Sequence, residues 1–198
     1  RLGTVYGLTE SCVAFTYADP DASDEQLAST IGRPDPRLDF RIDSQDGPGE
    51  LLLNNPCLMT EYLNQPEATS ATFAPDGYLR TGDLAQMRPD GLIEVVGRLK
   101  EMFKSGGYNV YPREVELAIE EHEAVETVVV VPIPDEKFHE VGVAFVVVSP
   151  TSEMKLTETD LAEHCRTRLA SYKVPKRFEL VERLPQISIG KIDRSALR

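Results

Sequence analysis

Positive charge is scarce in this sequence. Its 198 residues include 21 Lys and Arg against 33 Asp and Glu, for a formal net charge of -12. Nucleic acids and anionic membrane surfaces select proteins with broad basic patches, so this deficit argues against both as general partners. Any anionic ligand must therefore meet a local basic site.

Cysteine is also sparse, and its spacing excludes a common class of site. The three cysteines are Cys12, Cys57 and Cys165, an odd number without the short spacings of a zinc site. Such usage is typical of a reduced intracellular protein with buried or idle thiols. We therefore expect neither a disulfide framework nor a zinc site.

Long apolar runs are missing as well. No stretch approaches membrane-spanning length, and the N-terminal "RLGTVYGLTES" has neither the pattern of a signal peptide nor an initiator methionine. We expect a cytoplasmic protein without an integral membrane segment. We also expect the sequence to be a piece of a longer chain.

The apolar residues that are present suffice for one ordinary domain or two small ones. Asp, Pro and Ser crowd residues 18–36 and predict a loop. Apolar runs after turn signals predict strands at 49–54 and 91–98, with a short helix over 64–73 between them. Residues 76–85 alternate turn and strand signals.

The pattern changes after Pro112, which suits the first turn of a helix over 113–121. Two β-branched runs follow at 125–133 and 141–149, and their lack of alternation predicts strands buried on both faces. Thr157 begins a second predicted helix, because Asp160 stands three residues on as in a capping box. Its apolar stripe consists of Leu161, Cys165 and Leu169.

Three short motifs contain candidate chemistry, although each has an ordinary alternative. "YGLTE" places Tyr6, Thr9 and Glu10 together, a ring, a hydroxyl and a carboxylate that suit a base, a phosphate oxygen and a magnesium ion. By itself it is equally an ordinary strand end. "TGDL" offers Asp83 to a sugar diol or to a turn, and "GKIDR" offers Lys191 as a ligand or as a solvated lysine.

A fourth stretch, "GRLKEMFKSGGYNVYPREVE" from residue 97, concentrates basic side chains in an acidic protein. Arg98, Lys100 and Lys104 precede the adjacent glycines Gly106 and Gly107, which permit a turn that other residues resist. Local structure alone makes this stretch a basic hairpin capped by a loop.

The order of these motifs resembles that of the AMP-forming adenylating enzymes, a superfamily of acyl- and aryl-CoA synthetases, carrier-loading adenylation domains and firefly luciferase. "YGLTE", "IGRP", "GYLRTGDLA", the basic stretch and "LPQISIGKIDRSALR" cover essentially the whole chain. The resemblance implies an α/β protein, α+β in its small domain. Residues 1–97 would end the large N-terminal domain, and residues 98–198 would form the small mobile C-terminal domain.

The resemblance also implies a role for each candidate residue. Tyr6 would stack near adenine, Thr9 contact phosphate and Glu10 contact magnesium, while Asp83 and Arg98 would hold the ribose hydroxyls. The resemblance also implies three roles in the small domain: catalysis of adenylation, a hinge for domain rotation, and a face that forms the thioester. The residues in these roles are Lys191, which would bridge the acid and the α-phosphate, the hinge residue Lys100, and Lys104, Gly106 and Gly107 on the thioester-forming face.

The glycine-containing stretch is most similar to that of acyl-CoA synthetases. It implies an enzyme that joins a carboxylic acid, such as a fatty or other acyl acid, to CoA through an acyl-adenylate, with ATP and magnesium. The family's phosphate loop and acid pocket lie upstream of this sequence, so we expect the 198 residues alone to be inactive. A carrier-protein-loading domain and a non-catalytic binding module are the alternatives.

Overall fold

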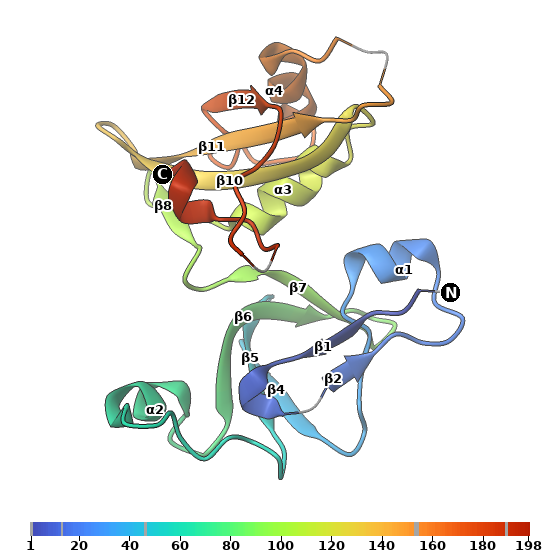
Figure 1. Ribbon diagram of the computed structural model, residues 1–198, viewed down its shortest axis with the longest axis vertical. Helices are drawn as coiled ribbons and strands as arrows, with labels where there is room; N and C mark the ends of the chain where they lie inside the picture. Colours follow the sequence, from blue (N-terminus) through green and yellow to red (C-terminus); the bar gives the residue numbers. More distant parts are fainter. Residues whose placement is uncertain (1, 13, 46, 153–154, 189) are drawn as a thin grey trace. The chain divides into compact units, whose positions relative to one another are not determined.

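A computed structural model describes residues 2–12, 14–45, 47–152, 155–188 and 190–198 (Figure 1). The chain divides into two compact units, one ending at Lys100 and the other beginning at Glu101. We call them the first and second units. The division lies just beyond the boundary that the sequence analysis placed between Gly97 and Arg98.

The first unit contains two antiparallel sheets. The three-stranded sheet has the order β1 (Val5–Gly7), β2 (Ala14–Tyr17), β3 (Arg33–Pro34). The four-stranded sheet follows the chain order β4 (Asp39–Asp43), β5 (Gly49–Asn54), β6 (Leu79–Met87), β7 (Ile93–Arg98). The strands predicted at 49–54 and 91–98 are confirmed as β5 and β7. Buried apolar side chains from both sheets form one core: Phe15, Leu51, Leu53, Leu79, Ala85 and Ile93.

Helices complete the first unit, and one of them contradicts the sequence analysis. Residues 18–36 were predicted to be a loop but contain α1 (Asp24–Ser29). Its N-cap Ser23 accepts a hydrogen bond from the Gln26 backbone, while the Gln26 side chain accepts one from the Ser23 N–H. The Asp, Pro and Ser residues around this short helix favour turns, so they mask its capping box in the sequence. The predicted helix over 64–73 is confirmed as α2 (Pro66–Thr72), which begins with proline.

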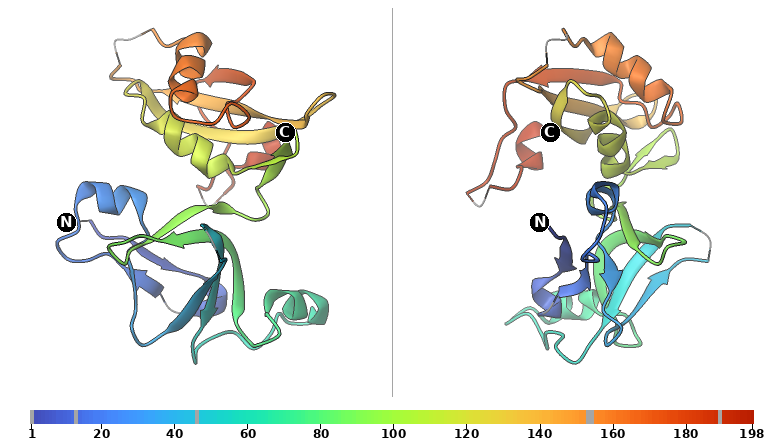
Figure 2. Two further views of the ribbon diagram at one scale, coloured as in Figure 1. Left: turned by 180° about the vertical axis from the view of Figure 1, so that it is seen from behind. Right: turned by 90° about the vertical axis from the view of Figure 1, so that its right-hand side faces the viewer.

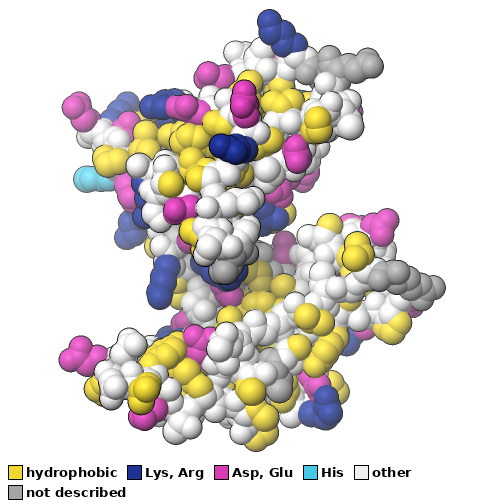
Figure 3. All heavy atoms as spheres, viewed as in Figure 1, with side chains coloured by type: hydrophobic (Ala, Val, Ile, Leu, Met, Phe, Trp, Pro, Cys, Tyr) yellow, Lys and Arg dark blue, Asp and Glu magenta, His cyan; other side chains and the backbone are white. Residues whose placement is uncertain are grey.

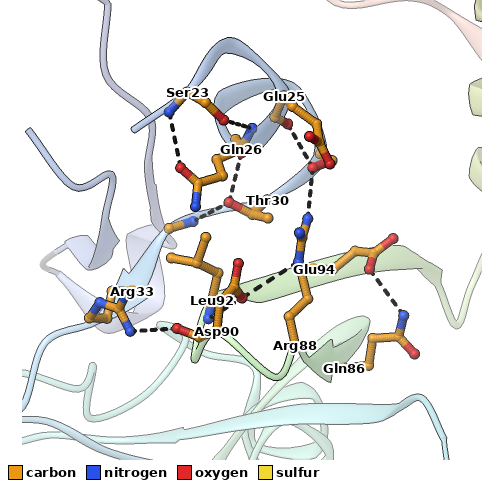
Figure 4. A network of polar contacts seen from close by, with 12 residues as sticks. Ser23, Glu25, Gln26, Thr30, Arg33, Gln86, Arg88, Asp90, Leu92 and Glu94 are labelled. Carbon is orange, nitrogen blue, oxygen red and sulfur yellow. Dashed lines mark hydrogen bonds and ion pairs between the residues drawn. The ribbon is translucent and has the colours of Figure 1, made fainter. Parts of the chain in front are cut away.

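Long-range hydrogen bonds hold α1 in place (Figure 4). The Arg88 guanidinium donates to the Ser29 hydroxyl at 3.1 Å, and Arg33 in β3 donates to the Asp90 carbonyl at 3.0 Å. These bonds join α1 and β3 to the turn between β6 and β7. A six-residue helix is too short to be stable alone, so this tertiary support explains its presence.

The second unit is built on a five-stranded mixed sheet. Its strands run in the order β10 (Val125–Asp135), β11 (His139–Val148), β8 (Phe103–Ser105), β9 (Tyr108–Val110). A fifth strand, β12 (Arg177–Val181), pairs with β11 in parallel. The β-branched runs are therefore the two long strands β10 and β11, as predicted, with β10 at the edge of the sheet.

Both faces of this sheet are covered (Figure 2). On one face lie α3 (Pro112–Glu120) and α4 (Glu158–Arg166), and Val128 and Val130 pack into the core beneath them. Alternate residues Val129 and Val131 enter a second cluster with Leu184 and Leu197 from the C-terminal segment. The prediction of strands buried on both faces is confirmed. The Thr157 cap of α4 is confirmed too, because its hydroxyl accepts from the Asp160 N–H.

These layers give an α+β architecture. The three cysteines are free, and burial raises the pKa of the Cys165 thiol to about 11, so this thiol stays protonated. Among the described residues, no helix is long and apolar enough to cross a membrane. Lys and Arg are interspersed with Asp and Glu on the face shown in Figure 3.

Candidate functional site

Three of the predicted nucleotide-binding residues meet in the first unit. Strand pairing sets Asp83 in β6 directly opposite Arg98 in β7, and the Arg98 Nε lies 2.9 Å from the Asp83 carboxylate. The Tyr6 hydroxyl, from β1, donates to the other carboxylate oxygen at 2.6 Å. The Asp83 side chain is 4% exposed, whereas that of Arg98 is 62% exposed. The result is a buried acceptor beside an accessible cation.

Local backbone geometry fixes the main chain at Asp83. Thr81 accepts a hydrogen bond from the Asp83 N–H at 3.0 Å and donates its own hydroxyl proton to the Leu51 carbonyl at 2.7 Å. Gly82 between them has φ of +72°, a conformation that favours glycine. This explains why threonine, glycine and aspartate occur in succession in the "TGD" motif.

Electrostatics keep Tyr6 neutral. Burial raises the pKa of the Tyr6 hydroxyl far above its usual value, and the adjacent Asp83 charge raises it further. Tyr6 is therefore a permanent hydrogen-bond donor to Asp83. A carboxylate has about four lone-pair sites, so Asp83 retains acceptor capacity for a sugar hydroxyl.

The other two residues of "YGLTE" lie in a short 3-10 helix, Thr9–Ser11. Thr9 is exposed. The Glu10 carboxylate accepts a hydrogen bond from the Tyr62 hydroxyl at 2.7 Å, and this bond raises the pKa of Tyr62. Tyr62 was not among the predicted site residues. It is 52 positions from Glu10, and nothing in the local sequence pairs the two.

Glu10 and Tyr62 line a cavity of about 490 Å³ within the first unit. Thr81, Gly82 and Lys100 lie on its wall, as does Glu50, which forms an ion pair of 2.9 Å with Arg80. The cavity therefore presents carboxylates, a phenol hydroxyl and a cationic side chain. This is the mixture of donors and acceptors expected around a polar ligand.

The predicted glycine turn is confirmed in the second unit. Gly106 and Gly107 have φ of +58° and +88° and connect β8 to β9, where Ser105 pairs with Tyr108. Two positive φ values are characteristic of a type I′ hairpin turn. A Cβ on Gly106 would lie 3.1 Å from the Phe138 ring. Lys104 is exposed on β8, two residues before the glycines.

Lys191 is exposed near the C-terminus, also in the second unit. Its carbonyl accepts from the Ile187 N–H at 2.8 Å, and Gln186 forms a bridge with Ile192. The structure thus groups Tyr6 with Asp83 and Arg98, pairs Glu10 with Tyr62, and places the glycine turn and Lys191 in the other unit.

Comparison with known proteins identifies relatives of this chain. Residues 114–191 match the family described as the AMP-binding enzyme C-terminal domain. The chain is 39% identical over 195 residues to 3-[(3aS,4S,7aS)-7a-methyl-1,5-dioxo-octahydro-1H-inden-4-yl]propanoyl:CoA ligase of Rhodococcus jostii, covering 98% of this chain and 37% of that protein. It is 37% identical over 201 residues to the long-chain-fatty-acid–CoA ligase FadD13 of Mycobacterium tuberculosis, covering 98% and 39%.

A solved structure of another CoA synthetase is also similar to this chain. The o-succinylbenzoate CoA synthetase of Bacillus subtilis, in complex with an acyl-adenylate intermediate, matches with a TM-score of 0.84 and 31% identity. The match covers 99% of this chain and 40% of that protein. The chain therefore spans about two fifths of the length of the relatives that it matches.

Proposed function

Because this chain belongs to the superfamily of AMP-forming adenylating enzymes and matches their C-terminal portion, we propose that it is part of an ATP-dependent acid–CoA ligase. The Tyr6–Asp83–Arg98 cluster is the observation that carries this proposal, because it joins a buried acceptor to an exposed cation. Three relatives are named for CoA ligation of different acids. We propose that the longer protein activates a carboxylic acid, a fatty or other acyl acid, for transfer to CoA.

The first unit would hold the nucleotide. Asp83 and Arg98 would bind the ribose hydroxyls, since the carboxylate accepts and the guanidinium donates. Tyr6 would orient Asp83 through its hydrogen bond while its ring lies near adenine. The exposed Thr9 hydroxyl would contact phosphate. The separate positions of these groups fit a ligand with a base, a sugar and a phosphate.

Glu10 fits a magnesium ion that arrives with the nucleotide. Among the described residues, no group of three or more His, Cys, Asp or Glu could hold a metal ion by itself. Magnesium, however, is commonly bound through one or two carboxylates together with substrate phosphates. Tyr62 would orient the Glu10 carboxylate through its hydrogen bond. The ion would neutralise charge on the phosphates.

The second unit would act in both half-reactions. During adenylation, Lys191 would contact the acid and the α-phosphate together, aligning the reactants and stabilising the charge that develops between them. For thioester formation, the turn at Gly106 and Gly107 would let the pantetheine arm of CoA pass close to backbone, with Lys104 on the same face. Lys100 would be the hinge between the two arrangements.

We place the protein in the cytoplasm on the basis of its free cysteines. Its partners would be a small carboxylic acid, ATP and CoA, and its acidic charge gives no reason to expect nucleic acid. Adding either CoA or a phosphopantetheinyl carrier protein to acid, ATP and enzyme would separate the CoA ligase from the carrier-loading alternative.

The decisive test separates the two half-reactions in the full-length enzyme. Lys191→Ala should slow acyl-adenylate formation by about two to three decades and largely spare thioester formation from supplied acyl-adenylate. Lys104→Ala is the matched lysine variant and should show the opposite preference. Single-turnover rates measure both steps. Equal losses in both steps for Lys191→Ala would overturn its assigned role.

Residues 1–198 alone should not release pyrophosphate in response to an acid, because the chain covers about two fifths of its relatives. Acid-dependent pyrophosphate release by this chain would contradict that expectation.

A further inference from the structure

An ion pair with a buried carboxylate anchors the C-terminal segment of the second unit. Glu116 in α3 is 2% exposed, and Arg194 begins the 3-10 helix Arg194–Leu197. The two guanidinium nitrogens Nη1 and Nη2 donate to the two carboxylate oxygens of Glu116 at 2.7 and 3.1 Å. This is the bidentate geometry that makes arginine–carboxylate pairs strong and directional.

The same pair satisfies an open edge of the sheet. Among the described strands, β10 pairs with β11 on one side only. On its other side, the Val130 N–H donates to Glu116 at 2.9 Å and the Val130 carbonyl accepts from Arg194 at 3.0 Å. Glu116 and Arg194 thus take the place of a neighbouring strand at this residue. Because buried backbone groups need partners, the position of Arg194 is tightly specified.

Further contacts transmit this position to the backbone that carries Lys191. Asp193, next to Arg194, donates its N–H to the Pro185 carbonyl at 2.8 Å. The preceding segment is held in turn by Leu184, which is buried in the cluster with Val129 and Val131. The Lys191 carbonyl accepts from Ile187, so the two sides of the segment are tied together. Lys191 therefore extends from a backbone that is fixed on both sides.

We propose that Arg194 is a positioning residue for Lys191, so that its bond to Glu116 sets the rate of adenylation. This inference rests on the proposed function of Lys191. A long lysine side chain adds its own freedom to any movement of its backbone, and a misplacement of about 1 Å can cost about a hundredfold in rate. The buried pair removes the backbone part of that freedom.

The structural half of the inference can be tested on this chain without any activity assay. Arg194→Met should raise the hydrogen-exchange rates of the Ile187 and Gly190 amides at least tenfold, while amides within β10 and β11 stay protected. Arg194→Lys should fold even if Arg194→Met does not, because it keeps a positive charge beside Glu116. A lysine cannot, however, reproduce the bidentate geometry of the arginine. The amide exchange rates of Arg194→Lys should lie between those of wild type and of Arg194→Met. Arg198→Met, at an exposed arginine in the same segment, is the matched control.

The catalytic half is tested in the full-length enzyme by single-turnover rates. Arg194→Met should slow adenylation ten- to a hundredfold with little change in the ATP KM and little effect on thioester formation from supplied acyl-adenylate. Arg194→Lys should recover part of the rate, and Arg198→Met should match wild type.

Three outcomes would count against the proposal. Unchanged exchange in Arg194→Met overturns the anchoring, and increased exchange with a wild-type adenylation rate overturns the link to Lys191. Equal loss in both half-reactions makes Arg194 merely structural. A wild-type enzyme that forms no acyl-adenylate would instead refute the proposed function, and with it the catalytic half, whatever the exchange data show.

Discussion

Asp83 and Asp39 both accept a hydrogen bond from a tyrosine hydroxyl, yet their surroundings differ. Asp83 is buried and takes the Tyr6 proton donor on one oxygen and Arg98 on the other. Asp39 is exposed on the edge strand β4 and accepts from Tyr78. A hydrogen bond to a charged group gains strength where water is excluded, so the two aspartates should differ in their importance for ligand binding.

Asp83→Asn should therefore weaken AMP binding by the full-length enzyme about 10- to 100-fold, the usual cost of a charged hydrogen bond. The amide keeps the shape of the side chain but loses the charge that orders Arg98. Asp39→Asn supplies the control, since it changes the same kind of pair in the same sheet and should leave AMP affinity unchanged. Calorimetric titration with AMP gives both affinities. Equal affinities for the two variants would remove Asp83 from the ribose site.

A histidine side chain connects α4 to α3. His164 in α4 lies with Nε2 2.8 Å from the Ala118 carbonyl in α3, a geometry in which the ring N–H donates. Burial lowers the pKa of His164 and is the largest effect. The hydrogen bond to the Ala118 carbonyl and the charge of Glu121 raise the pKa, while the charges of Arg168 and His122 lower it. The folded protein therefore favours neutral His164 more than the unfolded chain does.

Stability from this histidine should be present above its ordinary pKa of about 6.5 and be lost as pH falls below it, because protonation then favours the unfolded chain. His164→Gln can still donate to Ala118 but cannot titrate. Between about pH 7.5 and 5.5, the melting temperature of this variant should fall by about 2 °C less than that of wild type. His139→Asn, at an exposed residue with positive φ, should keep the wild-type slope. Identical slopes for His164→Gln and wild type would contradict the assignment.

At the scale of the whole molecule, the chain passes from one compact unit to the other at a single point. The first unit ends at Lys100, two residues after the end of β7. The intervening residue, Leu99, donates its N–H to the Gly82 carbonyl at 2.8 Å. Lys100 is exposed. A proposed hinge at this residue requires its backbone to adopt two sets of dihedral angles, one for each half-reaction.

Proline at this position should allow at most one of those settings, because its ring holds φ near about -65°. Lys100→Pro in the full-length enzyme should therefore spare adenylation and depress thioester formation. Lys100→Ala should do little, since the hinge needs rotation rather than charge. Single-turnover rates for each half-reaction, with a thermal melt to verify folding, decide the matter. Uniform loss, or no loss, would end the hinge assignment.

Local signals in the sequence determined much of the architecture. The uninterrupted β-branched runs specified β10 and β11 as strands buried on both faces, and Thr157 with Asp160 specified the start of α4. Adjacent glycines specified the tight hairpin between β8 and β9. These features depend on backbone preferences within a few residues, so one sequence suffices to recognise them. The motif order was likewise enough to indicate the superfamily.

Tertiary structure decided the pairings between distant residues. Tyr6 and Asp83 are 77 positions apart, Glu116 and Arg194 are 78 apart, and no local pattern matches their donors to their acceptors. The helix α1 also depended on its surroundings, because Arg88 reaches it from 59 positions away. A buried polar group must find a partner somewhere in the folded chain. Which partner it finds is decided only when strands and helices bring distant segments together.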